Sequence, residues 1–179
     1  MKKLLIVCLL VGPISVFAQV GTTFPDMETE KVDDAKVMLP KDVSDKYTLL
    51  GMAYSKKAEK DMTTWFSPVY NKFMRKSEGL FSSFTYDINV YFVPMFTGIK
   101  AAATQAAKNK AAKDLDPLLI NNILFYKGNL KPYKDALDFE RKDVPYIFLV
   151  DQDGNIAYAT SGAYSDKKME DIEEFLDSL

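Results

Sequence analysis

The chain is 179 residues long, 47% hydrophobic and 27% charged, a composition typical of a one-domain globular protein. Its 23 lysines and arginines nearly balance 25 acidic residues, so we expect no nucleic-acid-binding surface. The sequence contains no histidine and a single cysteine, Cys8. These absences exclude a Ser-His-Asp triad and disfavour zinc, and we expect neither a metal site nor a cofactor.

Residues 1–18 have the pattern of a secretory signal: two lysines, an apolar run over residues 4–11 and a small-residue cleavage site at residues 16–18. The run is too short to anchor the chain stably, and no later stretch of the sequence is long and apolar enough to span a bilayer. We therefore expect an exported protein with no integral membrane segment after cleavage and one domain formed by residues 19–179. An uncleaved anchor is the alternative.

The single cysteine lies inside the predicted signal. Cys8 follows Val7, whereas a lipid-attachment site needs a small residue there, so we disfavour a lipoprotein. Residues 19–179 carry no thiol. A cysteine-free exported domain fits a bacterial periplasm better than an extracellular setting, where small domains are commonly disulfide-bonded.

Two strands are predicted at the start of the domain. Residues 37–39, directly before Pro40, predict a short edge strand. The continuous apolar run over residues 47–54 has the length of a strand and no polar alternation. It therefore predicts a central strand that is buried on both faces.

A helix and a further strand follow. Apolar residues at helical spacing over residues 62–74 predict an amphipathic helix, which Pro68 should kink or break. The run over residues 84–93 is β-branched and aromatic, which favours a second buried strand. Because proline lacks the amide hydrogen of a strand, Pro94 is expected to end it.

Residues 99–115 are rich in alanine, lysine and glutamine and form the strongest intrinsic helix former of the chain. The alanine face permits close packing, and we expect the lysines to face water, with a basic docking stripe as the alternative. These lysines are Lys100, Lys108, Lys110 and Lys113. Another helix is expected over residues 118–126, ended by Gly128, and a short helix or turn around residues 133–137.

The last third predicts a hairpin and a helix. Residues 146–150 and 156–160 are strands, joined by a turn in which Gly154 supplies a positive φ. A final helix starts at Ser165-Asp166. Its apolar stripe comprises Met169, Ile172, Phe175, Leu176 and Leu179. Strands and helices alternate along the chain without a repeat or linker, which predicts one α/β domain.

Several strings resemble the thioredoxin-like superfamily, in particular its exported, thiol-reductase-like branch. They are Phe24-Pro25-Asp26, residues 37–40 followed by 45–50, and residues 144–156 with Pro145 directly before a strand. The resemblance implies an α/β fold with a central mixed sheet of four to five strands flanked by helices. It says little about activity.

The chain departs from that family at the active-site motif. The family places Cys-x-x-Cys after the first core strand, where this chain has Ser55-Lys56-Lys57-Ala58. Thiol–disulfide exchange needs a thiolate, and serine forms no disulfide. We therefore expect neither a disulfide oxidoreductase nor a thiol peroxidase.

A second resemblance is to the thioredoxin-like assembly factors of the mitochondrial ATP synthase. The matching strings are residues 92–96, 135–137, 143–151, 154–156 and 161–163. Members of that family are chaperones for a hydrophobic membrane subunit. The resemblance implies that a thioredoxin-like domain without cysteines can serve as a protein-binding or assembly module.

We predict that a protein or peptide partner binds in a groove beside the position of the absent thiols. The predicted groove residues are Tyr54, Ser55, Lys56, Lys57, Val144 and Pro145. A cis bond before Pro145 would leave the backbone of Val144 open to strand addition by an extended peptide. The two lysines at a helix N-terminus suggest contact with an anion or an acidic partner, and surface charge without a role is the alternative.

A thiol-independent enzyme is the alternative to a binding module. It would pair Ser55 with a lysine base, or use a carboxylate at Asp87, Asp143 or Asp151. Residues 151–155 superficially resemble a calcium loop but lack its distal glutamate, which favours a plain β-turn.

Overall fold

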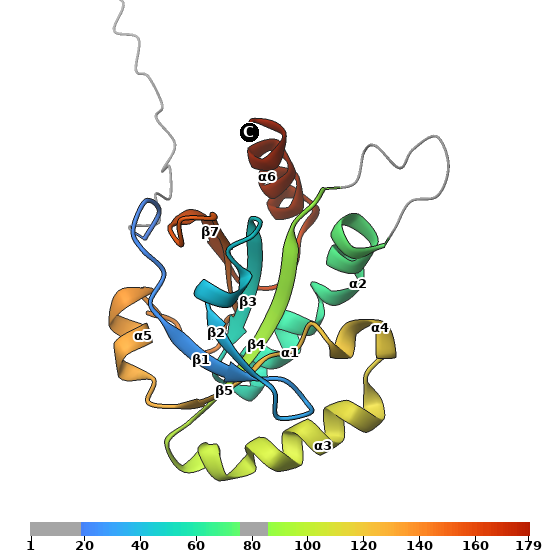
Figure 1. Ribbon diagram of the computed structural model, residues 1–179, viewed down its shortest axis with the longest axis vertical. Helices are drawn as coiled ribbons and strands as arrows, with labels where there is room; N and C mark the ends of the chain where they lie inside the picture. The colour runs from blue at the N-terminus through green and yellow to red at the C-terminus, as the bar shows by residue number, and fades with distance from the viewer. Residues whose placement is uncertain (1–18, 76–85) are drawn as a thin grey trace, which may run out of the picture.

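The computed structural model describes residues 19–75 and 86–179 (Figure 1). The predicted signal, residues 1–18, lies outside the described residues. The strands are β1 (Met27–Glu30), β2 (Lys36–Leu39), β3 (Thr48–Ala53), β4 (Asn89–Thr97), β5 (Phe125–Gly128), β6 (Tyr146–Val150) and β7 (Ile156–Ser161). The α-helices are α1 (Lys56–Thr63), α2 (Phe66–Val69), α3 (Thr104–Asp114), α4 (Pro117–Ile120), α5 (Lys131–Ala136) and α6 (Asp166–Asp177). Short 3₁₀ segments η1 (Lys41–Val43) and η4 (Gly98–Ala103) and the π-helical segment η2 (Tyr70–Met74) complete the list.

The described strands form one mixed sheet of seven strands in the order β2-β1-β5-β4-β3-β6-β7. The pairs β3–β4 and β4–β5 are parallel, and the other pairs are antiparallel. The predicted edge strand, central strand and C-terminal hairpin are confirmed, and Gly154 has the expected positive φ of 82°. The expected four to five strands were too few, because β1 and β5 are four residues each and carry little period-two signal.

The predicted helix over residues 118–126 is wrong beyond its first turn. Helix α4 ends at Ile120, and the chain then runs along the edge of β4, where the Phe92 amide donates to the Asn122 carbonyl at 2.8 Å. The Leu124 amide donates to the Phe92 carbonyl at 2.9 Å, and strand β5 follows. Pairing with an open strand edge thus overrides the local helical preference.

Two prolines act differently from the expectation. Strand β4 continues past Pro94 to Thr97, because Pro94 lies opposite Ala53, the last residue of β3, and β4 pairs only with β5 beyond that point. The helix over residues 62–74 does break, but at Thr64 and Trp65, before Pro68. Pro68 lies in the first turn of α2, where a missing amide hydrogen costs no helical hydrogen bond.

The sheet separates two hydrophobic layers, and β3 is buried on both faces as predicted. Leu50 and Met52 point into the layer that α5 covers, and Leu49 and Ala53 into the layer that α1, α2 and α6 cover (Figure 1). The apolar stripe of α6 is buried at Met169 and Ile172, whereas Leu179 is 66% exposed. No helix among the described residues is long and apolar enough to cross a membrane.

Candidate functional site

Ser55, at the position of the absent thiol motif, caps helix α1. It follows β3 in an extended conformation, and its Oγ accepts a hydrogen bond from the Ala58 amide at 3.1 Å. The same hydroxyl donates to Asp143 Oδ1 at 3.0 Å, and the side chain is only 4% exposed. The serine therefore joins α1 to the loop before β6, and both functions of its hydroxyl are already used.

Tyr54 belongs to the core rather than to an open groove. Its ring stacks on Phe139 with centroids 5.5 Å apart, and its hydroxyl donates to the Phe139 carbonyl at 3.2 Å. Burial, aided by the charges of Tyr146 and Asp143, raises the pKa of Tyr54 to about 12. The tyrosine remains neutral and structural at physiological pH.

The cis bond before Pro145, which was the condition for strand addition at Val144, is not found. Within the described residues the cis bond precedes Pro40, and Val144–Pro145 has the ordinary trans geometry. Pro145 is buried directly before β6, and its carbonyl accepts from the Gly162 amide at 2.8 Å. Val144 is half-buried against the core. The argument for strand addition at Val144 therefore loses its premise.

The structure does not assemble the alternative catalytic groups. Lys57 lies on the exposed face of α1 and binds Asp61 at 2.7 Å, one turn along the same helix, while Ser55 faces Asp143. Lys56 is exposed. Asp87, which we considered as a carboxylate catalyst, forms a surface ion pair with Lys46 at 2.6 Å.

The turn after β6 is a β-turn closed by its own carboxylate. Asp151 Oδ1 accepts from the Asp153 amide at 3.0 Å and from the Asn155 amide at 2.7 Å. The described part of the chain holds no group of three acidic, histidine or cysteine side chains placed to bind a metal. The turn interpretation is thus preferred to a calcium loop on its hydrogen bonds.

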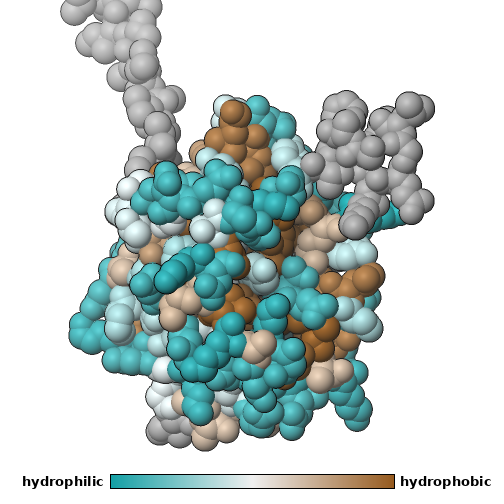
Figure 2. All heavy atoms as spheres, in the orientation of Figure 1, coloured by the Kyte–Doolittle hydropathy of each residue, from teal (hydrophilic) through white to brown (hydrophobic). Residues whose placement is uncertain are grey.

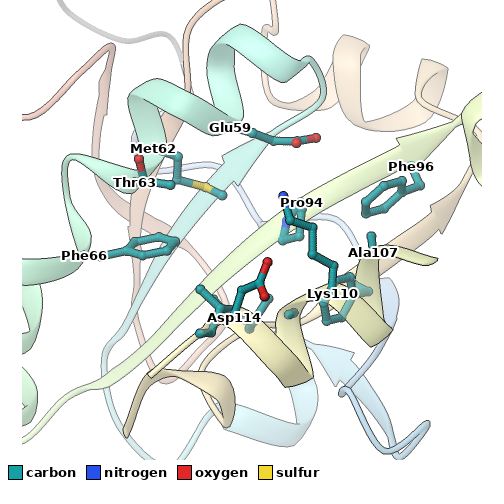
Figure 3. A pocket seen from close by; sticks show the side chains of 13 residues that line it. Glu59, Met62, Thr63, Phe66, Pro94, Phe96, Ala107, Lys110 and Asp114 are labelled. Carbon is teal, nitrogen blue, oxygen red and sulfur yellow. The ribbon is translucent and has the colours of Figure 1, made fainter. Parts of the chain in front are cut away.

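An apolar pocket of about 320 Å³ opens between α1–α2 on one side and α3 on the other (Figure 3); we refer to it as the α1–α3 groove. Its floor is formed by side chains of β4 and β5, among them Phe96 and Phe125. Met62 and Phe66 line one wall, and small side chains of α3 line the other. Figure 2 shows hydrophobic surface continuing beside it over α4, where Leu118 is 59% exposed.

The rim of the α1–α3 groove carries charges of both signs. Glu59, half-buried on α1, lies across from Lys110 and Asp114 of α3 (Figure 3). Burial raises the pKa of Glu59, and the nearby Lys100 and Lys56 oppose that shift. Thr63 contributes a hydroxyl to the lining, which donates to the Lys60 carbonyl at 2.7 Å, and most of the remaining lining is apolar, which suits the binding of an apolar segment.

A buried lysine holds the α3 wall in place, which corrects the expectation that Lys108 faces water. Its side chain is 1% exposed, and its Nζ contacts Glu30 Oε2 at 2.5 Å and Asp34 Oδ1 at 2.6 Å. Burial lowers the pKa of Lys108, but the hydrogen bonds and charges of Asp34 and Glu30 outweigh it and raise the pKa above 10.5. The lysine stays charged and ties α3 to the β1–β2 hairpin, while Ala107 and Ala111 face the groove.

The sequence model of the ATP10 protein family matches residues 9–179. The chain belongs to the ATP10 family. No curated protein matches it by sequence. This result agrees with the second resemblance noted in the sequence, although the match extends over nearly the whole chain rather than its C-terminal half.

Solved structures establish that the fold of this ATP10-family protein is thioredoxin-like. BsSco, a member of the Sco family of cytochrome c oxidase assembly proteins, has a TM-score of 0.55 and 12% identity, covering 87% of this chain and 94% of that one. The exposed lipoprotein thioredoxin Etrx1 from Streptococcus pneumoniae has a TM-score of 0.54 and 17% identity, covering 87% and 100%. A thiol peroxidase from Chromobacterium violaceum has a TM-score of 0.51 and 12% identity, covering 91% and 88%. At these identities the likeness concerns the fold alone.

The predicted groove residues do not form one open surface in the ATP10-family protein. The structure brings Ser55 next to Asp143, but it buries Tyr54 and Pro145. The α1–α3 groove was missed, although the alanine face of residues 99–115 was a visible signal. The floor of the groove depends on β5, which pairs with β4. Because the helix predicted over residues 118–126 covered the start of β5, the sequence did not indicate this pairing.

Proposed function

We propose that this ATP10-family protein is a redox-inactive assembly factor for the ATP synthase that binds an apolar segment of a client subunit. Family membership supports ATP synthase components as the partners. The α1–α3 groove supports the mode of action, since most of the side chains that line it are aromatic or aliphatic. The observation that carries the proposal is this exposed apolar groove in a chain whose thiol position is occupied by a capping serine.

Export is part of the proposal. A secretory signal at residues 1–18 would place the domain outside the cytoplasm, with the periplasm preferred because residues 19–179 carry no cysteine. Cell fractionation with an antibody to the domain tests this point. Recovery of a full-length chain in the cytoplasm would contradict it.

Site-specific crosslinking tests the proposed mode of action. A photoreactive residue replaces either Phe66, in the groove, or Lys57, on the exposed N-terminal turn of α1. Crosslinks to ATP synthase subunits are identified by immunoblot in native membranes. We expect a membrane-sector subunit to crosslink from Phe66 and not from Lys57. Crosslinking from Lys57 alone would move the client to the originally predicted surface.

Helix α3 supplies a matched pair of variants for the same experiment. Ala111 is half-buried in the groove wall, and Ala112, the next residue, is exposed. Ala111→Glu places a charge into the apolar space and should abolish the crosslink, whereas Ala112→Glu should preserve it. Equal crosslinking by both variants would exclude the groove as the client site.

A further inference from the structure

A second hollow, of about 400 Å³, lies at the end of the sheet where β3 and β4 finish; we refer to it as the lysine hollow. Side chains from four separate parts of the chain line it. They are Tyr54 after β3, Lys100 in η4, Leu130 and Lys134 at the start of α5, and Glu140 and Lys142 in the loop before β6. The residues lie far apart in sequence, so only the fold brings them together.

The charge of this hollow is unbalanced. Three lysines face one glutamate, and none of the three has a carboxylate within 4.0 Å anywhere in the described ranges 19–75 and 86–179. Other lysines of the protein, such as Lys57 and Lys131, bind an acid one turn along their own helix. Ammonium groups gathered around a concave space repel one another, and an inserted anion removes that repulsion.

The surroundings indicate what kind of anion fits. Asp135, Asp138 and Asp143 are exposed beside the hollow in sequence, and the segment 131–143 carries four positive and four negative side chains. Because acids alternate with lysines along this segment, its charge is not uniformly positive, which disfavours an anionic membrane as the ligand. A single carboxylate entering the hollow meets the lysines, while the half-buried Leu130 contacts its aliphatic stem.

We propose that the lysine hollow binds an acidic side chain of a partner polypeptide. The assignment rests on the proposed function in taking a polypeptide as the ligand, but the residues that line the hollow differ from those of the α1–α3 groove, although the charge of Lys100 also acts on Glu59 at the rim of that groove. The α1–α3 groove holds the client segment, and the lysine hollow binds a carboxylate of the same or a second partner. Of the groove residues predicted from sequence, only the largely buried Tyr54 lines this hollow, and the cations are Lys100, Lys134 and Lys142 instead of Lys56 and Lys57.

Peptide binding to charge-matched variants tests the proposal. The probe is a fluorescent peptide with two glutamates between leucines, and its glutamine counterpart is the neutral control. The hollow variant carries Lys100→Gln, Lys134→Gln and Lys142→Gln. The control variant carries Lys41→Gln, Lys60→Gln and Lys113→Gln, which are exposed lysines outside the hollow with the same loss of charge.

We expect the acidic peptide to bind the unmodified protein and the control variant equally, and to bind the hollow variant about tenfold more weakly. Binding should weaken with added salt, and the glutamine peptide should not bind. Equal weakening in both triple variants would overturn the proposal, since it would show an effect of net charge only. Circular dichroism of each variant confirms that the fold is intact.

Two further probes separate other anions from a polypeptide. Lysine-dependent binding of inorganic phosphate, or of vesicles containing phosphatidylglycerol, without binding of the acidic peptide would overturn the assignment. If the unmodified protein fails to bind the acidic peptide while the Phe66 crosslink persists, the assignment is overturned and the proposed function still stands. Peptide binding that survives Ala111→Glu would support two independent surfaces.

Discussion

The two ends of helix α1 differ in whether their side chains already have partners within the protein. At its N-terminus the Ser55 hydroxyl is hydrogen-bonded to the Ala58 amide and to Asp143, and the carbonyl of the nearby Pro145 accepts from the Gly162 amide, so the polar groups at the thiol position of the thioredoxin-like fold already have partners. Further along the helix Met62 lines the α1–α3 groove, where apolar side chains have no partner across an open space. The position at which the thioredoxin-like family carries its thiols thus has a structural role in this protein, and the exposed apolar surface lies elsewhere on the same fold.

A difference in polarity explains why these regions have different uses. The buried hydroxyl of Ser55 must find hydrogen-bond partners, and it finds the Ala58 amide and the exposed carboxylate of Asp143. An apolar groove has no such requirement and gains free energy from any apolar segment that fills it. Four variants can break or sharpen this comparison.

The largest effect should come from Trp65, which connects the two regions. The ring is fully buried beneath α2, and its Nε1 donates to the Gly162 carbonyl at 3.0 Å, while the Gly162 amide binds Pro145. We expect Trp65→Ala to lower the free energy of unfolding by about 3–5 kcal/mol in urea titrations. Trp65→Phe should cost less, because it keeps most of the apolar contact. Equal losses would assign the effect to the hydrogen bond alone.

Lys108→Met should affect the groove region and leave the Ser55 region intact. We expect a loss of about 2 kcal/mol, because two charge-assisted hydrogen bonds disappear while Glu30 and Asp34 regain contact with water. Hydrogen exchange should accelerate in α3 but not in α1. Lys113→Met, at an exposed position of the same helix, should change stability by less than about 0.5 kcal/mol.

The contribution of Lys108 has a defined pH dependence. Its pKa is raised in the folded state, so its ion pairs stabilise the protein fully below the ordinary lysine value of 10.5. They are lost as the pH rises through the higher folded-state pKa. The stability difference between the protein and Lys108→Met should therefore shrink only in strong alkali, and a difference that vanishes near neutral pH would contradict the ion-pair interpretation.

Ser55→Ala should weaken the contacts at the N-terminus of α1 and leave the α1–α3 groove unchanged. Loss of the helix cap and of the bond to Asp143 should cost about 1 kcal/mol of unfolding free energy. The crosslink from Phe66 should persist at its original strength. Ser44→Ala, which removes one exposed hydroxyl contact, is the stability control. A lost crosslink in Ser55→Ala would show that the two regions are coupled.

The smallest effect is expected from Tyr54→Phe, and it appears in alkali. Burial raises the pKa of Tyr54 to about 12, so the unfolded chain releases this proton at lower pH than the folded one. Stability should therefore fall as the pH rises from about 10 to about 12, and less steeply in Tyr54→Phe. Urea titrations at both ends of this range measure the slope. An identical slope would mean that Tyr54 is more open to water than the structure indicates.

Long or strongly patterned elements of this ATP10-family protein were predictable from sequence. The apolar run of β3, the alanine-rich α3 and the hairpin around Gly154 each carry a local signal that the fold preserves. The replacement of the thiol motif at Ser55 was equally visible, and with it the expectation of a protein without thiol redox chemistry. Local propensity and tertiary structure agree at these places.

The binding surfaces were decided by contacts between distant segments. Lys108 looks like a surface lysine until the β1–β2 hairpin brings Glu30 and Asp34 to it. The groove floor exists because β5 pairs with β4, and the lysine hollow exists because four chain segments meet where β3 and β4 finish. Periodicity reports which side of an element is apolar, but only packing determines which apolar faces are covered and which charges meet.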